Sequence, residues 1–119
     1  MLVSDLIRSA NHSILLIDNY LDDTVLQLFL KRKQDVAVTL YTRQVTPPLT
    51  LEVEKFNRQY GGITIQQLSH CHDRFMIIDK QVLYHIGASL KDLGKKWFAF
   101  SKIDSLTPAI LQRLGELQR

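Results

Sequence analysis

The sequence predicts an α/β domain built on a mixed β-sheet, and two patterns carry this prediction. Up to residue 68, apolar residues at helical spacing alternate with short apolar or β-branched runs, in the order helix, strand, three times over. Such βαβ units place their strands parallel. Further along, the apolar runs 75–78 and 82–86 flank Asp79-Lys80-Gln81, which predicts an antiparallel hairpin and therefore mixed pairing.

Local sequence signals predict where the helices and strands of the first half of the chain begin and end. Acidic Asp22 and Asp23 begin the second helical segment and the basic triplet Lys31-Arg32-Lys33 closes it, which suits a helix dipole. Pro47-Pro48 break the chain before the third helical segment, and Gly61-Gly62 stop that segment. Helices are therefore predicted at 2–10, 22–33 and 49–60, and strands at 14–17, 36–41 and 63–68. For the basic triplet a solvated helix end is favoured over a binding patch.

In the second half, the hairpin is followed by a polar, basic loop, 90–96, and by a strand that opens at Trp97. A last helix is predicted from Thr107 as N-cap, with Pro108 at its first position. Leu106 and Leu111 have the spacing of a hydrophobic staple around that cap.

Composition describes one ordinary globular domain over residues 1–119. Hydrophobic residues make up 45% of the chain and charged residues 23%, and the formal charge of +3 permits nucleic-acid binding without requiring it. The single cysteine excludes an internal disulfide, and the sequence has neither a membrane-spanning apolar run nor a signal-peptide pattern. We therefore expect a cytoplasmic protein. Because a short helix begins almost at Met1, the domain could be the C-terminal part of a longer protein.

The stretch from His70 to Asp79 is the most informative. Four apolar residues, 75–78, separate a polar head from Asp79, which predicts a short strand buried on both faces. Side chains alternate along a strand, so His72 and Arg74 leave the same face, where an imidazole and a guanidinium can hold an anion. Asp79 has the opposite parity and is predicted to be structural, tying the strand end to the following turn.

These residues resemble the signature of the phospholipase D-like (HKD) superfamily, His-x-Lys followed after four residues by Asp. His72, Arg74 and Asp79 keep that spacing, and Gly87-Ala88-Ser89 looks like the second element, Gly-Ser-x-Asn. The strand that ends in Asp18-Asn19-Tyr20 is similar to the family's first strand and turn, and the region after Gly87 looks like a branch of bacterial and mobile-element proteins. The resemblance implies a phospholipase D-like half-domain, a mixed β-sheet with helices on both faces.

The resemblance also implies a chemistry in which two half-sites meet. One histidine attacks a phosphodiester and forms a phosphohistidine, the other protonates the leaving oxygen, and no metal or other cofactor takes part. A chain with one such strand would have to form a homodimer. The implied catalytic residues are His72, Arg74 and Ser89; the implied phosphate-binding residues are Arg74, Lys91 and Lys95; Asp79 and Gly87 are structural.

The chain departs from the family pattern at several positions. Arg74 replaces a lysine with a planar, bidentate cation. Ala88 falls where the family has Ser unless Ser89 takes that role by a one-residue shift, and the family's Asn then falls on Leu90 or Lys91. For the acid that orients the histidine, Asp92 and Asp104 are the candidates.

Other interpretations stay open. His72 could be a nucleophile, an anion-binding residue of an inactive site, or structural. Arg74 could bind phosphate or pair with a carboxylate across the dimer, and His85 is more readily a core residue than part of the same cleft. Lys91, Lys95 and Lys96 beside Trp97 could follow phosphates or form a solvated loop. His70 and Cys71 with His72 suggest a metal only weakly, since neighbours on a strand point to opposite faces.

Two functions follow. The first is a homodimeric phosphodiesterase, a nuclease acting on DNA through a phosphohistidine. The second is a catalytically degenerate module for dimerisation or nucleic-acid binding within a larger protein. Nucleic acid is preferred over a membrane because no amphipathic membrane segment is present and a basic loop follows the motif.

Overall fold

The computed structural model describes residues 3–69, 74–86, 100–102 (backbone only) and 106–115. Its strands form one six-stranded sheet in the order β3-β2-β1-β4-β5-β6. The strands are β1 (Ser13–Ile17), β2 (Ala37–Thr42), β3 (Ile63–Gln67), β4 (Arg74–Ile78), β5 (Val82–Ile86) and β6 (Phe100–Lys102). The helices are α1 (Val3–Ser9), α2 (Asp23–Leu28), α3 (Pro47–Gln59) and α4 (Thr107–Leu114), and a 3₁₀ turn, η1 (Phe29–Lys31), continues α2.

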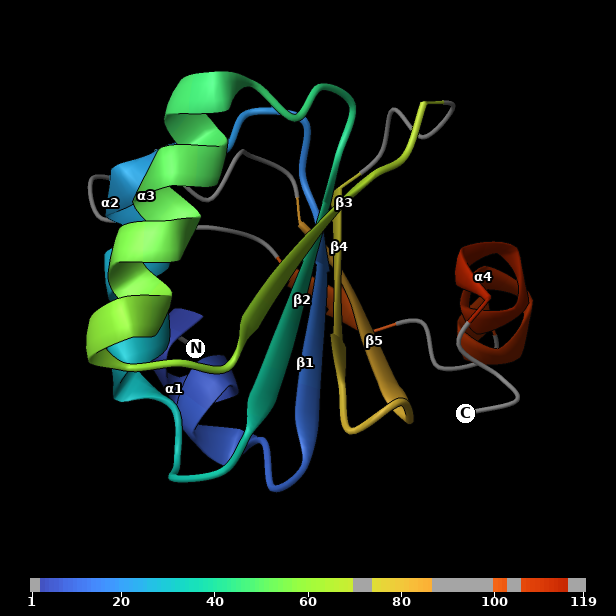
Figure 1. Ribbon diagram of the computed structural model, residues 1–119. Coiled ribbons are helices and arrows are strands. Elements are labelled where there is room, and N and C mark those ends of the chain that lie inside the picture. Colours follow the sequence, from blue (N-terminus) through green and yellow to red (C-terminus); the bar gives the residue numbers. More distant parts are fainter. Residues whose placement is uncertain (1–2, 70–73, 87–99, 103–105, 116–119) are drawn as a thin grey trace.

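The pairing is mixed, as the sequence predicts. Strands β1, β2 and β3 are parallel, whereas β4 is antiparallel to β1 and each of β5 and β6 is antiparallel to its predecessor. One edge of the sheet therefore holds the ends of β1, β2, β3 and β5 and the start of β4; we call it the carboxyl edge (Figure 1, top). The opposite edge, which we call the amino edge, holds the starts of β1 to β3 and the β4–β5 turn.

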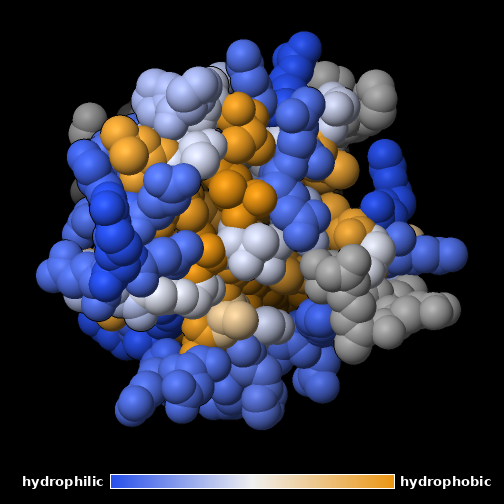
Figure 2. Space-filling view, viewed as in Figure 1, coloured by the Kyte–Doolittle hydropathy of each residue, from blue (hydrophilic) through white to orange (hydrophobic). Residues whose placement is uncertain are grey.

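Helices cover both faces of the sheet, which confirms the predicted α/β architecture. Helices α1, α2 and α3 lie on one face and α4 on the other (Figure 1). Alternating strand residues divide between two cores, so that Leu16 and Met76 face α1–α3 while Ile17 and Ile77 face α4. In the same view, hydrophobic atoms gather in a central strip between the helical layer and the sheet, with hydrophilic atoms around it (Figure 2).

The ends of α3 match the sequence signals. Thr46 is the N-cap, and its side chain accepts a hydrogen bond from the Leu49 backbone N–H at 3.3 Å. At the other end, Gly61 and Gly62 have φ angles of 73° and 86°, the left-handed region that glycine adopts without strain. The chain therefore leaves α3 sharply and enters β3.

The predicted start of the last helix is wrong by one residue. Helix α4 begins at Thr107, so Leu106 stands at the N-cap position and makes no side-chain capping bond. Thr107 is buried, and its hydroxyl donates to the Gln81 carbonyl at 3.2 Å instead of capping the helix. Leu106 is 45% exposed. The tertiary contact with the β4–β5 turn has overridden the local capping preference.

In the part of the chain that the structure describes, no helix has the length and apolar character to cross a membrane.

Candidate functional site

Two of the predicted site residues, Arg74 and Asp79, belong to the described residues. His72, Gly87, Ser89, Lys91 and Lys95 lie outside them, as do His70, Cys71, Asp92, Lys96, Trp97 and Asp104. The strand register nevertheless relates the two motif elements. Arg74 is the partner of Ile86 across β4 and β5, His72 precedes Arg74 by two positions, and Gly87 directly follows Ile86. Both elements are therefore joined to neighbouring strand ends at the carboxyl edge.

Arg74 is held by two residues that follow β1. Its Nε lies 3.8 Å from Oδ1 of Asp18, and its Cζ lies 5.2 Å from the centroid of the Tyr20 ring. Asp18 is 1% exposed, whereas the Arg74 side chain is 28% exposed. Within the described residues, the buried Arg74 Nε finds no hydrogen-bond acceptor. The guanidinium is thus positioned by charge and by an aromatic face, while part of the side chain remains exposed.

The sequence places Asp18 beside Arg74 through strand pairing. Ile17 is the register partner of Phe75 in the antiparallel pair of β1 and β4. Asp18, which follows β1, and Arg74, the first residue of β4, are therefore opposite each other, on the face toward α1–α3. The Asp18 backbone N–H donates to the Tyr41 carbonyl at 3.0 Å, and its Oδ1 accepts from the Tyr20 backbone N–H at 2.9 Å. That turn brings the Tyr20 ring to the guanidinium.

A carboxylate of the same chain, that of Asp18, therefore faces Arg74. The interpretation in which Arg74 pairs across a dimer stays a prediction. A buried carboxylate needs a nearby positive charge, and Arg74 supplies one at 3.8 Å. Because Asp18 balances that charge, additional positive potential at this edge comes from Arg43. Arg43 is exposed just after β2, and its backbone N–H donates to Oδ1 of Asn19 at 3.0 Å.

Sequence reasoning assigned no role to Asp18, Tyr20 or Arg43 and treated the first two as parts of a turn. The available signal was an acid directly after an apolar strand. Such a residue is either solvated or paired, and the sequence did not specify the partner 56 residues further on.

Asp79 lies at the amino edge, away from Arg74. Its carboxylate accepts from the backbone N–H groups of Asn11 at 3.0 Å, His12 at 2.6 Å and Ser13 at 3.1 Å. Partial burial by itself raises the pKa of Asp79, but these hydrogen bonds and the nearby His12 together hold it below its ordinary value. The carboxylate ties the hairpin to the start of β1 as well as occupying its own turn.

His85 lies on the face of the sheet that α4 covers. Its ring centroid is 5.3 Å from that of Phe75, with the rings tilted by 56°. Phe75 packs with the α4-side core, whereas Arg74 points to the other face. His85 and Arg74 therefore do not share a cleft.

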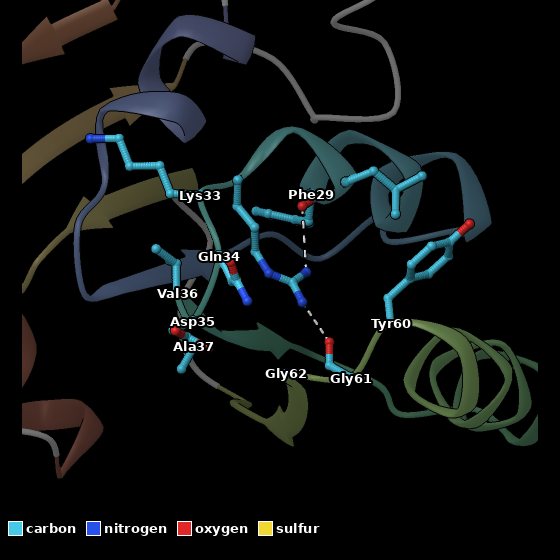
Figure 3. A pocket seen from close by; sticks show the side chains of 11 residues that line it. Phe29, Lys33, Gln34, Asp35, Val36, Ala37, Tyr60, Gly61 and Gly62 are labelled. Atoms are coloured by element: carbon cyan, nitrogen blue, oxygen red, sulfur yellow. Dashed lines mark hydrogen bonds between the residues drawn. The ribbon is translucent and has the colours of Figure 1, made fainter.

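A cleft of about 470 Å³ opens at the amino edge, between the loop after η1 and the turn after α3 (Figure 3). Arg32 fills part of it: its Nη2 donates to the Gly61 carbonyl at 2.5 Å and its Nη1 to the Phe29 carbonyl at 3.4 Å. Burial lowers the pKa of Arg32. Lys33 donates to Oδ1 of Asn11 at 2.7 Å. The prediction of a merely solvated helix end is therefore wrong for Arg32, which joins two loops.

No group of three or more His, Cys, Asp or Glu side chains suited to a metal ion occurs among the residues with described positions. His70 and Cys71, the weak metal candidates, lie outside them.

Comparisons with known proteins bear on the fold. No protein-family model matches the sequence, and no curated protein matches it. Among solved structures, the chain is similar to TrmBL2, an archaeal chromatin protein whose structure shows a novel mode of DNA binding, with a TM-score of 0.61 and 14% sequence identity. The match covers 95% of this chain and 45% of the TrmBL2 chain. The likeness therefore supports the α/β fold, and this chain spans less than half the length of that protein.

Proposed function

We propose that the carboxyl edge of the sheet binds the phosphate backbone of a nucleic acid, with Arg74 as the cation that contacts phosphate. The observation that carries this proposal is the position of Arg74, whose side chain faces Asp18 and the Tyr20 ring and is still 28% exposed. A guanidinium presents donors in a planar fork that fits a phosphate group. Fixing its orientation before binding lowers the entropy cost of recognition.

Nucleic acid is the favoured source of that phosphate for two reasons. The chain carries a mild net positive charge of +3, and Arg43 adds an exposed cation at the same edge. The fold is similar to that of a chromatin protein whose structure shows DNA binding. A domain of this size within a longer protein would serve as a nucleic-acid-binding module.

A second function, phosphodiester cleavage, is favoured by the motif spacing and by the register. His72, Arg74 and Asp79 keep the spacing of the phospholipase D-like signature, and Arg74 is paired with the residue before Gly87. In that reaction, the His72 imidazole attacks phosphorus and the P–O bond to the leaving oxygen breaks. The His72 of a second protomer protonates that oxygen, and water then hydrolyses the phosphohistidine. This route requires a homodimer and the support of Ser89, Lys91 and Lys95.

Binding is tested by fluorescence anisotropy with a labelled oligonucleotide over a range of salt concentrations. Arg74→Gln should weaken binding about tenfold and reduce the dependence of log affinity on log salt by about one ion. Arg8→Gln is the matched control, because it removes the same charge from the exposed surface of α1, where Arg8 pairs with Asp5 at 3.8 Å. Equal losses in both variants would reduce the effect to net charge and contradict a site at Arg74.

Cleavage is tested separately with supercoiled plasmid in EDTA. If the second function holds, the wild-type chain nicks the plasmid, His72→Ala does not, and sedimentation shows a dimer. Equal background in both proteins would reject phosphohistidine chemistry and leave the binding function as the conclusion.

A further inference from the structure

We infer that the carboxyl edge takes single-stranded nucleic acid, because Tyr20 provides a stacking surface for an unpaired base next to the phosphate site. This inference rests on the proposed binding function and makes it more specific. The substrate class, single-stranded nucleic acid, follows from the Tyr20 ring and its distance to the Arg74 guanidinium.

Tyr20 combines exposure with a fixed position. It is 53% exposed and lies three residues after the end of the central strand β1. Its backbone N–H donates to the buried carboxylate of Asp18 at 2.9 Å, so the turn that carries the ring is anchored to the core. A ring held in this way loses little conformational entropy when a ligand packs against it.

The distance to Arg74 couples base and phosphate recognition. The guanidinium carbon lies 5.2 Å from the Tyr20 ring centroid. A phosphate bound to that guanidinium would therefore bring the attached nucleotide next to the ring. Proteins that bind single strands commonly combine a cation for the backbone with an aromatic ring for the base.

Base pairing determines which nucleic acid can use this arrangement. In a duplex the bases are stacked on one another and paired, so stacking on a protein ring would require extrusion at a cost of a few kcal/mol. An unpaired base avoids that cost. A single strand should therefore gain from both Arg74 and Tyr20, whereas a duplex gains from Arg74 alone.

Tyr60 is a comparison residue within the same chain. It is 49% exposed, but it lies at the amino edge, and its ring is tilted against Phe56 at a centroid distance of 5.0 Å. It lines the cleft in which Arg32 is already bonded to carbonyl groups (Figure 3). Tyr60 thus matches Tyr20 in type and exposure, but no guanidinium of the described residues lies over its ring.

The test compares three probes of 12 nucleotides per strand, with equal charge per strand, in the anisotropy assay. They are a mixed-sequence single strand, an abasic single strand of the same length, and the duplex of the mixed sequence. We expect the wild-type chain to prefer the single strand with bases. Tyr20→Leu should weaken binding to that probe by about five- to 150-fold, the range for loss of one stacked base. Binding to the abasic strand and to the duplex should fall by less, because those probes lose only the contact of the Tyr20 ring with the Arg74 guanidinium.

Two further variants and two further measurements complete the design. Tyr20→Trp should retain binding because it keeps an aromatic face, and Tyr60→Leu should bind all three probes as the wild type does. Thermal unfolding of Tyr20→Leu is measured alongside to confirm that the exposed substitution leaves the fold intact. A single strand carrying 5-iodouracil should cross-link to Tyr20 on irradiation, which peptide mapping would detect.

The outcomes separate this inference from the function on which it rests. The inference would be overturned if Tyr20→Leu bound the single strand as tightly as the wild type does, or if the wild type preferred the duplex. In either case, binding of the duplex and the abasic probe that depends on Arg74 would still support the phosphate site. If none of the three probes bound, the proposed function itself would be wrong.

Discussion

Arg32 and Arg74 lie at opposite edges of the same sheet, and their surroundings differ in one decisive respect. Arg32 gives both Nη groups to backbone carbonyls, those of Gly61 and Phe29, and its Cζ lies 5.6 Å from the centroid of the Phe56 ring. Arg74 also lies over an aromatic ring, but its charged neighbour is 3.8 Å away, and no described residue accepts a hydrogen bond from its Nε. The Nη groups of Arg32 are used by the fold, whereas the Arg74 side chain, which is 28% exposed, can take a ligand at its exposed part.

The difference shows how to interpret a basic residue in this protein. A lone positive charge in the sequence predicts neither role, because both arginines lie at an end of a regular element and both are partly exposed. Among the described residues, the number of donors already hydrogen-bonded distinguishes them. Variants at the two edges should therefore separate stability from binding.

The largest expected effect is on stability, from Arg32→Ala. The substitution removes two charge-assisted hydrogen bonds and the packing on Phe56, and it leaves the Gly61 carbonyl without its donor. We expect the free energy of unfolding to fall by about 2–3 kcal/mol, measured by urea denaturation. Binding to the oligonucleotide should not change.

Lys31→Ala is the matched control, since Lys31 is exposed and is the immediate neighbour in the basic triplet. It should change the free energy of unfolding by less than about 0.5 kcal/mol. A similar loss in both variants would contradict a structural role specific to Arg32.

The next effect concerns the glycine against which Arg32 packs. A Cβ on Gly62 would lie 2.8 Å from Nη2 of Arg32, in a residue whose φ is already 86°. Gly62→Ala should therefore destabilise the chain by about 2 kcal/mol. Gly61→Ala, with a φ of 73° and no atom nearer than 3.9 Å, should cost only the backbone strain of about 1 kcal/mol.

A double variant isolates the guanidinium. In Arg32→Ala the clash is absent, so adding Gly62→Ala should then cost no more than Gly61→Ala does. Additive effects of the two substitutions in urea denaturation would show that Arg32 does not determine the need for glycine at this position.

Most of the fold could be predicted because its signals are local. Apolar runs mark β1 and β4, and proline and glycine pairs bracket α3. The order of these elements then implies parallel strands followed by a hairpin, which the register confirms. Failures occurred where a distant contact overrode a local preference, as when Thr107 donates to Gln81 instead of capping α4.

The candidate site was predictable only in part, for the same reason. Arg74 stood out from its motif, but Asp18 and Tyr20 reach it only because β4 pairs antiparallel with β1. No local pattern specifies which strand will lie beside another. The contacts of Asp79 with residues 11–13 likewise depend on the position of the hairpin turn beside the start of β1.

Asp79 is an acidic side chain that the fold uses, and its contribution to stability depends on pH. Its pKa is lowered in the folded chain, so its deprotonated form stabilises the fold above the unfolded pKa of roughly 4. That contribution should be lost as the pH falls through the lower folded pKa. Asp79→Asn should therefore reduce the free energy of unfolding by about 1–2 kcal/mol at pH 7, and the difference from wild type should shrink below about pH 4.

Asp35→Asn serves as the control for the Asp-to-Asn substitution itself. Asp35 is exposed, and its φ of 67° is close to the 55° of Asp79, so the same substitution in the same backbone region tests only the hydrogen bonds. At pH 7, Asp35→Asn should change the free energy of unfolding in urea by less than about 0.5 kcal/mol. If the free energies of unfolding of Asp79→Asn and wild type ran parallel between pH 2.5 and pH 7, the assigned role of the Asp79 carboxylate would be contradicted.

The smallest expected effect on stability comes from Arg74→Gln, although this variant should have the larger effect on binding. The pair with Asp18 is long, at 3.8 Å, and Arg74 is partly exposed, so its contribution should be about 1 kcal/mol or less and should weaken in salt. Asp18 keeps the closer donor, the Tyr20 N–H at 2.9 Å. Urea denaturation of Arg74→Gln, Asp18→Asn and the double variant measures the coupling directly. A loss of 3 kcal/mol or more in Arg74→Gln would mean that the buried Asp18 carboxylate depends on this cation. Arg74 would then have a structural role, as Arg32 does.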